Sequence, residues 1–150
     1  LVKAQQTDEF WLEWCIDELA QGRAVQILSN GYSMWPCIRP KDNLLISAVP
    51  FSSVQINDII AFQRQNHIVV HRVVEIFDSE NGNALRTIGD SNSVDDEPID
   101  RSNFIGKVSE VNGIIVQSVA PSPFKRRIYR FVIWSLNLVL RGIRFFRRLL

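Results

Sequence analysis

A serine on a bend is the first candidate for chemistry in this chain. Residues 30–36 read Asn-Gly-Tyr-Ser-Met-Trp-Pro and separate two apolar runs, so Ser33 lies in a connection. Gly31 allows a tight backbone path, and Pro36 fixes the direction in which the chain leaves the bend. A serine hydroxyl becomes nucleophilic only when a proton acceptor is held beside it. Most serines in such loops have a structural role, and Ser33 therefore needs a partner.

The partner that the sequence offers is His71, which interrupts the apolar run of residues 68–74. Taken alone, a histidine in this place is more typical of a hydrogen-bonded side chain at the edge of a sheet. Residues 89–96 follow as a turn that contains Asp90 and Asp96, and a carboxylate can orient an imidazole. An acidic turn by itself is more often a solvated surface or a cation-binding loop. Together, the three residue types predict a nucleophile, its general base and an orienting acid.

The elements that must bring these residues together are mainly β. Turn-forming clusters separate seven runs of β-forming residues, with no helix between them: residues 24–28, 44–48, 59–63, 68–76, 85–88, 104–111 and 114–119. Asn112-Gly113, between the last two runs, is typical of a two-residue hairpin. The pattern predicts a mainly β fold, as a curled β-sheet or a partly open barrel.

An amphipathic helix is expected before the sheet, over residues 8–21, and Gly22 is expected to end it. The helix is too charged to span a bilayer, so we expect it to pack on the domain. Its apolar side is expected to contain Phe10, Trp11, Trp14, Cys15 and Leu19. Residues 1–120 are thus expected to form one domain that includes this helix, with residues 121–150 as a helical tail.

Composition allows one packed domain and argues against disorder. Of the 150 residues, 46% are hydrophobic, and Gly and Pro number only 7 and 6. Cys15 and Cys37 match no metal-ligand spacing, and we expect buried apolar side chains there rather than ligands or a disulfide. We expect neither a metal nor a cofactor.

The charge distribution singles out the C-terminal tail. The formal net charge is +1, yet residues 125–150 contain one lysine and seven arginines and no acid. On a helix over residues 124–150 one side would carry Arg126, Arg127, Arg130, Arg141, Arg144 and Arg148, with apolar residues on most of the rest. The uncharged stretch of residues 131–140 is short of the ~20 apolar residues that span a bilayer.

This tail favours peripheral attachment to an anionic membrane surface, on a side that the sequence does not specify. A helix docked on the domain or on a second subunit is the alternative. Nucleic acid is disfavoured as a partner, because the tail is too apolar to stand free and no basic groove with aromatic residues accompanies it.

Four segments occur in a fixed order: Gly31-Tyr-Ser33-Met34-Trp-Pro36, Asp58-Ile-Ile-Ala-Phe62, Val70-His71-Arg72-Val73 and Gly89-Asp90-Ser-Asn92. Together they resemble the signal-peptidase and repressor-cleavage superfamily. The resemblance covers about residues 29–111 and implies a β-rich fold and a serine peptidase. In this superfamily the general base is Lys in bacterial type I enzymes and self-cleaving repressors. It is His in the endoplasmic-reticulum, archaeal and spore-associated signal peptidases, which Val70-His71-Arg72-Val73 resembles.

The resemblance implies a role for each site residue. Ser33 is expected to be the nucleophile and His71 the base, with Asp96 steadying His71. Asp90 is expected to hold the loop or to share that task. Gly31, Met34 and Pro36 shape the bend, where the Ser33 N–H would be an oxyanion donor worth roughly 3 kcal/mol of barrier. Activity is expected to fall below about pH 6, where an imidazole protonates.

The chain departs from the family pattern at several loop positions. Gly31 stands where the family usually has Ser, and Lys41 and Asn57 stand where it usually has Gly. The missing glycines bear on loop geometry more than on chemistry. Lys41 or Lys107 as the base is a minor alternative, because neither lies where the family's Lys base occurs.

The favoured function is a membrane-associated serine endopeptidase that cleaves a precursor or exported peptide. The alternative is a regulatory or binding module on the same fold, either non-catalytic or processing only its own chain. No helix-turn-helix and no Ala-Gly or Cys-Gly dipeptide precedes Ser33, which disfavours a self-cleaving repressor. The presence of both Ser33 and His71 disfavours a degenerate site.

Overall fold

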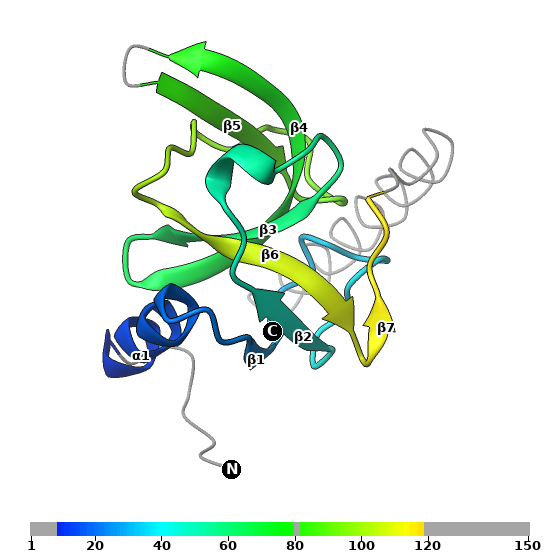
Figure 1. The fold of residues 1–150 in the computed structure, drawn as a ribbon. Coiled ribbons are helices and arrows are strands. Elements are labelled where there is room, and N and C mark those ends of the chain that lie inside the picture. The colour runs from blue at the N-terminus through cyan, green and yellow to red at the C-terminus, as the bar shows by residue number, and fades with distance from the viewer. Residues whose placement is uncertain (1–8, 80–81, 119–150) are drawn as a thin grey trace, which may run out of the picture.

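A computed structural model describes residues 9–79 and 82–118, which form one antiparallel sheet and one helix (Figure 1). Helix α1 spans Glu9–Ala20 and a short 3-10 helix, η1, spans Phe51–Ser53. The strands are β1 Val25–Leu28, β2 Asn43–Ser47, β3 Ile59–Arg64, β4 His67–Ser79, β5 Gly82–Ile88, β6 Phe104–Val111 and β7 Ile114–Ile115. The prediction of a mainly β fold with one N-terminal helix is confirmed.

The sheet is open, with strand order β1-β2-β6-β3-β4-β5 and β7 paired to β6. Every strand pair is antiparallel, and β3 lies between β6 and β4 near the middle of the sheet. The long β4–β5 hairpin extends away from α1, which lies near β1 (Figure 1). The last strand is shorter than predicted, because beyond Ile115 the ladder continues only through the Val116 N–H to the Ser109 carbonyl.

Alternation along the strands builds two apolar clusters, one on each face of the sheet. From β3, Ile59 and Ala61 join the cluster that contains α1, while Ile60 and Phe62 join the cluster beside η1. Because both faces of β3 are covered, its first four residues are all buried. The strand is thus a rigid support for the neighbouring β4, which carries His71.

Helix α1 packs through Leu12, Cys15 and Leu19, which are buried at helical spacing. Phe10 and Trp14 are 82% and 50% exposed, so the prediction that they share the buried side is wrong. At 100° per residue, Phe10 lies almost opposite the middle of the stripe formed by Leu12, Cys15 and Leu19, and Trp14 lies outside that stripe.

The turns contain several residues with left-handed backbone angles. Asn112 and Gly113 have φ of 52° and 78° between β6 and β7, which confirms the predicted two-residue hairpin. Lys41 and Asn57 have φ of 73° and 77°. The chain therefore keeps glycine-type backbone geometry at both positions where the resemblance would have placed Gly.

The predicted C-terminal helix, the domain boundary at residue 120 and the six arginines assigned to membrane binding lie outside the described residues. Among the helices that are described, none is long and apolar enough to cross a bilayer.

Candidate active site

Ser33 and His71 meet although 38 positions separate them in the sequence. Strand β1 leads into the bend that carries Ser33, and His71 lies on β4 opposite Ile60 of β3. The Ser33 Oγ lies 3.0 Å from the His71 Nε2, within hydrogen-bond distance. The imidazole is 5% exposed, and its ring packs edge-on against Phe62.

Asp96 holds the other side of the imidazole. Its Oδ2 lies 2.5 Å from the His71 Nδ1 and also accepts a hydrogen bond of 2.6 Å from the Thr87 hydroxyl. Its Oδ1 accepts a hydrogen bond of 3.0 Å from Arg64, and its backbone N–H donates to the Thr87 carbonyl. Each carboxylate oxygen is therefore engaged, which fixes the plane of the group.

The pKa of Asp96 lies below its ordinary value. Burial by itself would raise this pKa, but the hydrogen bonds from His71 and Thr87, the charge of His71 and the hydrogen bond from Arg64 outweigh it. An ionised Asp96 can only accept hydrogen bonds, so the His71 Nδ1 carries the proton toward it. In the neutral imidazole, Nε2 then has a free lone pair that faces the Ser33 hydroxyl, as a general base requires.

The nucleophile bend is tied to the turn that follows β5. The Ser33 carbonyl accepts hydrogen bonds of 2.9 Å from both the N–H and the hydroxyl of Ser91, and that hydroxyl also reaches the Tyr32 carbonyl at 2.8 Å. A Cβ on Gly89 would lie only 2.7 Å from the Ser33 carbonyl oxygen. Within the bend, Met34 is buried and the Trp35–Pro36 peptide is cis. Gly89 thus allows the turn to approach the bend closely, and the Ser91 hydrogen bonds hold Ser33 in position.

Asp90 has a different place from Asp96. Its two oxygens accept hydrogen bonds of 2.9 and 2.8 Å from the Nε and Nη2 of Arg72, and both side chains are almost fully buried. Of the two roles expected for Asp90, this geometry favours holding the loop, because the carboxylate is occupied by Arg72 rather than by His71. The pair joins β4 to the turn that contains Ser91.

Neither cysteine competes with Ser33 as a nucleophile. Both are free, Cys15 being buried as expected, whereas Cys37 is exposed, which corrects the expectation for it. Burial raises the pKa of Cys15 to about 12. The Cys37 residue is exposed as a whole, but partial burial of its thiol raises its pKa to about 11, and the neighbouring Asp90 adds to the shift. Both thiols are therefore protonated at neutral pH, and the thiolate is the reactive form.

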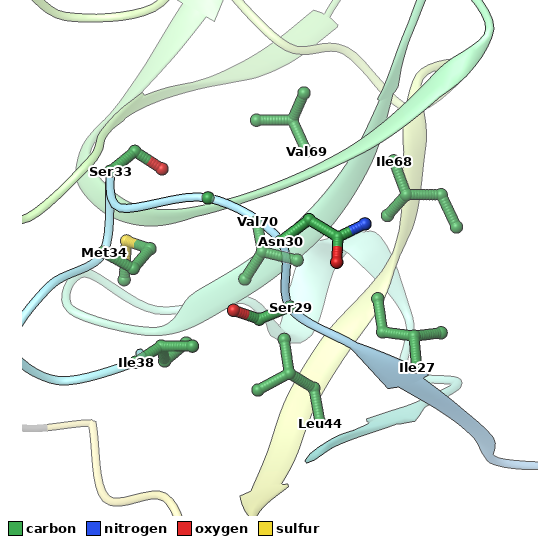
Figure 2. A pocket seen from close by; sticks show the side chains of 11 residues that line it. Ile27, Ser29, Asn30, Ser33, Met34, Ile38, Leu44, Ile68, Val69 and Val70 are labelled. Carbon is green, nitrogen blue, oxygen red and sulfur yellow. The ribbon is translucent and has the colours of Figure 1, made fainter. Parts of the chain in front are cut away.

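A pocket of about 210 Å³ opens beside Ser33, between the bend and β4 (Figure 2). Most of its lining is aliphatic: Ile27, Met34, Ile38, Leu44, Ile68, Val69 and Val70. Ser33 lies at one end of the view and Ile27 and Ile68 at the other, with Ser29 and Asn30 between them. The pocket could take an aliphatic side chain whose neighbouring carbonyl faces Ser33.

The lysines considered as alternative bases have other surroundings. Lys107 Nζ lies 2.7 Å from the buried Asp58 Oδ1, and Ser118 also donates to this oxygen. Lys41 is exposed in a turn. Among residues 9–79 and 82–118, no cluster of His, Cys, Asp or Glu is suited to hold a metal ion.

The site includes residues that the sequence interpretation did not assign. Thr87 and Arg64 hold Asp96, and Ser91 fastens the Ser33 carbonyl. Only Ser91 stood in a segment with a recognisable pattern. Thr87 and Arg64 occur within β5 and β3, where no local sequence signal marks them.

Comparison with known proteins adds no relative, since neither a scan of protein-family models nor a search of curated proteins gives a match. The arrangement of Ser33, His71 and Asp96 is therefore the observation on which a function must depend.

Proposed function

We propose that this chain is a serine endopeptidase with Ser33 as nucleophile, His71 as general base and Asp96 as the residue that orients His71. The observation that carries the proposal is the continuous chain of contacts, 3.0 Å from Ser33 Oγ to His71 Nε2 and 2.5 Å from His71 Nδ1 to Asp96 Oδ2. A buried imidazole between a serine and a carboxylate whose pKa is lowered has the polarity that acyl transfer needs.

In the proposed reaction, the Ser33 hydroxyl attacks a peptide carbonyl carbon while the His71 Nε2 takes its proton. The tetrahedral intermediate then collapses, the C–N bond breaks, and His71 gives the proton to the leaving amine. Water, deprotonated by His71, hydrolyses the Ser33 ester and returns the enzyme to its starting state. Asp96 stabilises the imidazolium that forms in each half of the reaction. The Ser33 N–H is the proposed oxyanion donor.

The substrate is proposed to be an extended peptide that lies along β4. This strand pairs with β3 from His67 to Arg72, but on its other side it pairs with β5 only from Arg72 onward. The backbone of residues 68–71 thus offers an edge to which an extended chain can add. The aliphatic pocket next to Ser33 favours a small or medium apolar side chain near the cleaved bond.

The likeness to signal peptidases of the His branch is part of the proposal. The supporting features are the open antiparallel sheet, the order of Ser33 before His71, and the Arg72–Asp90 pair beside the site. On this proposal the sheet is a partly open barrel of the signal-peptidase type. The chain would then process a precursor or exported peptide near a membrane surface.

The test is cleavage of a proteome-derived peptide library, read by mass spectrometry, with the full 150-residue chain. Ser33→Ala and His71→Ala are expected to lower the cleavage rate by at least 10³-fold, as loss of a serine or histidine from such a unit does. Ser53→Ala and His67→Ala are matched controls, because both residues are exposed and lie outside the site. His67 is the other histidine of the chain and lies on β4, as His71 does.

Full activity in both controls, together with its loss in Ser33→Ala and His71→Ala, supports the proposal. Equal cleavage by wild type and Ser33→Ala overturns it, and the chain would then be a binding module on this fold.

A further inference from the structure

Arg64, at the end of β3, approaches the site from the side away from the nucleophile. It lines a second, polar pocket of about 490 Å³ together with Asp96. Its guanidinium Nη2 lies 3.0 Å from Asp96 Oδ1, and its carbon Cζ lies 5.5 Å from the centre of the Phe62 ring. The Phe62 ring in turn packs edge-on against His71, with ring centres 6.1 Å apart. Arg64 is thus held by both neighbours of the imidazole.

Asp96 is shared between two cations whenever His71 is protonated. One oxygen faces His71 and Thr87, and the other faces Arg64. Arg64 is permanently charged, so it repels an imidazolium at His71. It also partly neutralises the negative potential that Asp96 exerts on His71. The same contact keeps Asp96 ionised and fixes the plane in which it meets His71.

Other charged groups around His71 occur mostly as neutralised pairs. Asp58, just before β3, pairs with Lys107 of β6, and Arg72 of β4 pairs with Asp90 in the turn after β5. The two acids that flank Asp96, Asp95 and Glu97, are exposed to solvent, where water screens them. Among these groups Arg64 is the one charge in direct contact with the carboxylate that orients the imidazole.

We propose that Arg64 is a positioning residue that acts through Asp96 and sets the pH range in which His71 is a free base. This inference rests on the proposed function. When the Arg64 charge is removed, the negative charge of Asp96 interacts with the His71 imidazolium alone and stabilises it more. Activity is then lost at a higher pH on the acid side of the profile.

The test compares Arg64→Met, Arg64→Lys and wild type. Methionine keeps an apolar stem over Phe62 without charge, and lysine restores the charge without the planar fork. The acid limb of the pH profile of kcat/KM is expected to move up by about 0.5–1 pH unit in Arg64→Met. In Arg64→Lys the limb is expected to stay near its wild-type position, even if kcat falls.

Arg86→Met is a closely matched control. Arg86 also pairs with a carboxylate, Glu75, and also stacks on an aromatic ring, Phe77, but as the strand neighbour of Thr87 it is on the opposite face of β5 from the site. Its loss is expected to leave the acid limb unchanged.

The same comparison can be made without a substrate, by following the two imidazoles by NMR as the pH changes. The titration midpoint of His71 is expected to rise in Arg64→Met, while that of the exposed His67 is the internal reference. An unmoved His71 midpoint and an unmoved acid limb, or equal shifts in Arg86→Met, overturn the role of Arg64. If His71 shifts as expected but Ser33→Ala cleaves as well as wild type, the electrostatic role holds and the peptidase proposal fails.

Discussion

At the scale of single residues, Gly31 is the position at which the proposed signal-peptidase pattern would have Ser. A Cβ built on Gly31 would lie 3.9 Å from both the Ser33 backbone nitrogen and the Ser33 Oγ, and it meets nothing closer. A side chain there therefore fits without displacing the bend. It would also stand next to the proposed oxyanion donor.

We predict that Gly31→Ser raises kcat by roughly 10-fold, because the hydroxyl of the introduced side chain can add a second donor to the oxyanion hole. A fully formed oxyanion donor contributes about 10²–10³-fold to the rate. The measurement is kcat on one peptide substrate, with Gly31→Ala as the control that adds the Cβ alone. If alanine and serine give the same rate, the added hydroxyl does not reach the developing charge.

Lys41 offers a second test at this scale, on stability. Its φ of 73° places a residue with a Cβ in the left-handed region, which costs roughly 1–2 kcal/mol. Glycine relieves this strain but loses more backbone entropy on folding, by roughly 0.5–1 kcal/mol. We predict that Lys41→Gly raises the free energy of unfolding by about 0.5–1 kcal/mol.

Urea denaturation measures this change, and Lys41→Ala separates its cause. Alanine removes the lysine side chain but keeps the Cβ, so its stability should stay near that of wild type. A Lys41→Gly variant no more stable than Lys41→Ala would mean that the turn stores no strain.

At the scale of elements, the site depends on how closely the turn after β5 approaches the Ser33 bend. The limiting contact is at Gly89, where a Cβ would be 2.7 Å from a backbone oxygen that cannot easily move. We predict that Gly89→Ala pushes the two segments apart, weakens the Ser91 hydrogen bonds to the Ser33 carbonyl and lowers kcat at least 10-fold. The stability loss should be about 1–3 kcal/mol, as for other overpacked sites.

Gly106→Ala is the control, since its Cβ would meet the Ser47 carbonyl oxygen at 2.8 Å, between β6 and β2. Both variants should lose stability, and activity should be compared per folded molecule. If Gly106→Ala loses as much activity as Gly89→Ala, the turn has no special part in aiming Ser33.

The elements themselves were largely predictable from sequence, because each strand is a run of β-forming residues between turn-forming clusters. Ser33, His71 and Asp96 were also predictable by type, since each stands out from its local pattern. Their partners were not. Thr87 reaches Asp96 because a bulge in the β4–β5 ladder brings it opposite Val73, on the face of His71, and no residue-level signal specifies that register. Arg64 contacts Asp96 across 32 positions in the sequence.

The buried side of α1 was predicted only in part. The prediction placed Cys15 and Leu19, which are buried, on the same side as Phe10 and Trp14, which are exposed. The sheet instead selects the stripe centred on Cys15 and leaves Phe10 exposed. Helix α1 contacts β1 and β6, so the choice of its buried side is a property of the assembled domain.

At the scale of the whole molecule, Asp58 joins β3, β6 and the chain that leaves the sheet. It is fully buried and accepts hydrogen bonds from the Gln55 N–H, the Lys107 ammonium and the Ser118 hydroxyl. Burial alone would raise the pKa of Asp58, but these hydrogen bonds and the Lys107 charge hold it below its ordinary value. The folded state therefore binds the Asp58 proton less tightly than the unfolded state does.

It follows that Asp58 stabilises the fold above the unfolded pKa of about 3.9, and that this stabilisation is lost as the pH falls through the folded pKa. We predict that Asp58→Asn lowers the free energy of unfolding by about 2 kcal/mol at pH 7 and that the difference shrinks toward pH 3. Urea denaturation at both pH values checks this. Asp78→Asn, which alters an exposed carboxylate of β4, should change little, and a pH-independent loss in Asp58→Asn would contradict the linkage.

The arginine-rich tail of residues 125–150 lies outside the described residues. We propose that its basic side binds anionic lipid while its apolar side enters the acyl boundary. Each arginine near an anionic surface contributes about 1 kcal/mol, so we predict that Arg141, Arg144 and Arg148→Gln together weaken vesicle binding about 10²-fold. The measurement is co-sedimentation of the full chain with phosphatidylcholine vesicles, with and without about one-third phosphatidylserine.

The control makes the same change of net charge on the domain, through Arg23, Arg39 and Arg101→Gln, all of which are exposed. This control should bind anionic vesicles nearly as well as wild type, and binding by wild type should weaken as salt is added. A tail that docks on the domain instead would give a different result, namely no lipid binding and a lower melting temperature in the tail variant. Peptide cleavage in solution and vesicle binding are measured separately. A chain that cleaves peptides but does not bind vesicles would support the peptidase proposal and contradict the proposed membrane binding.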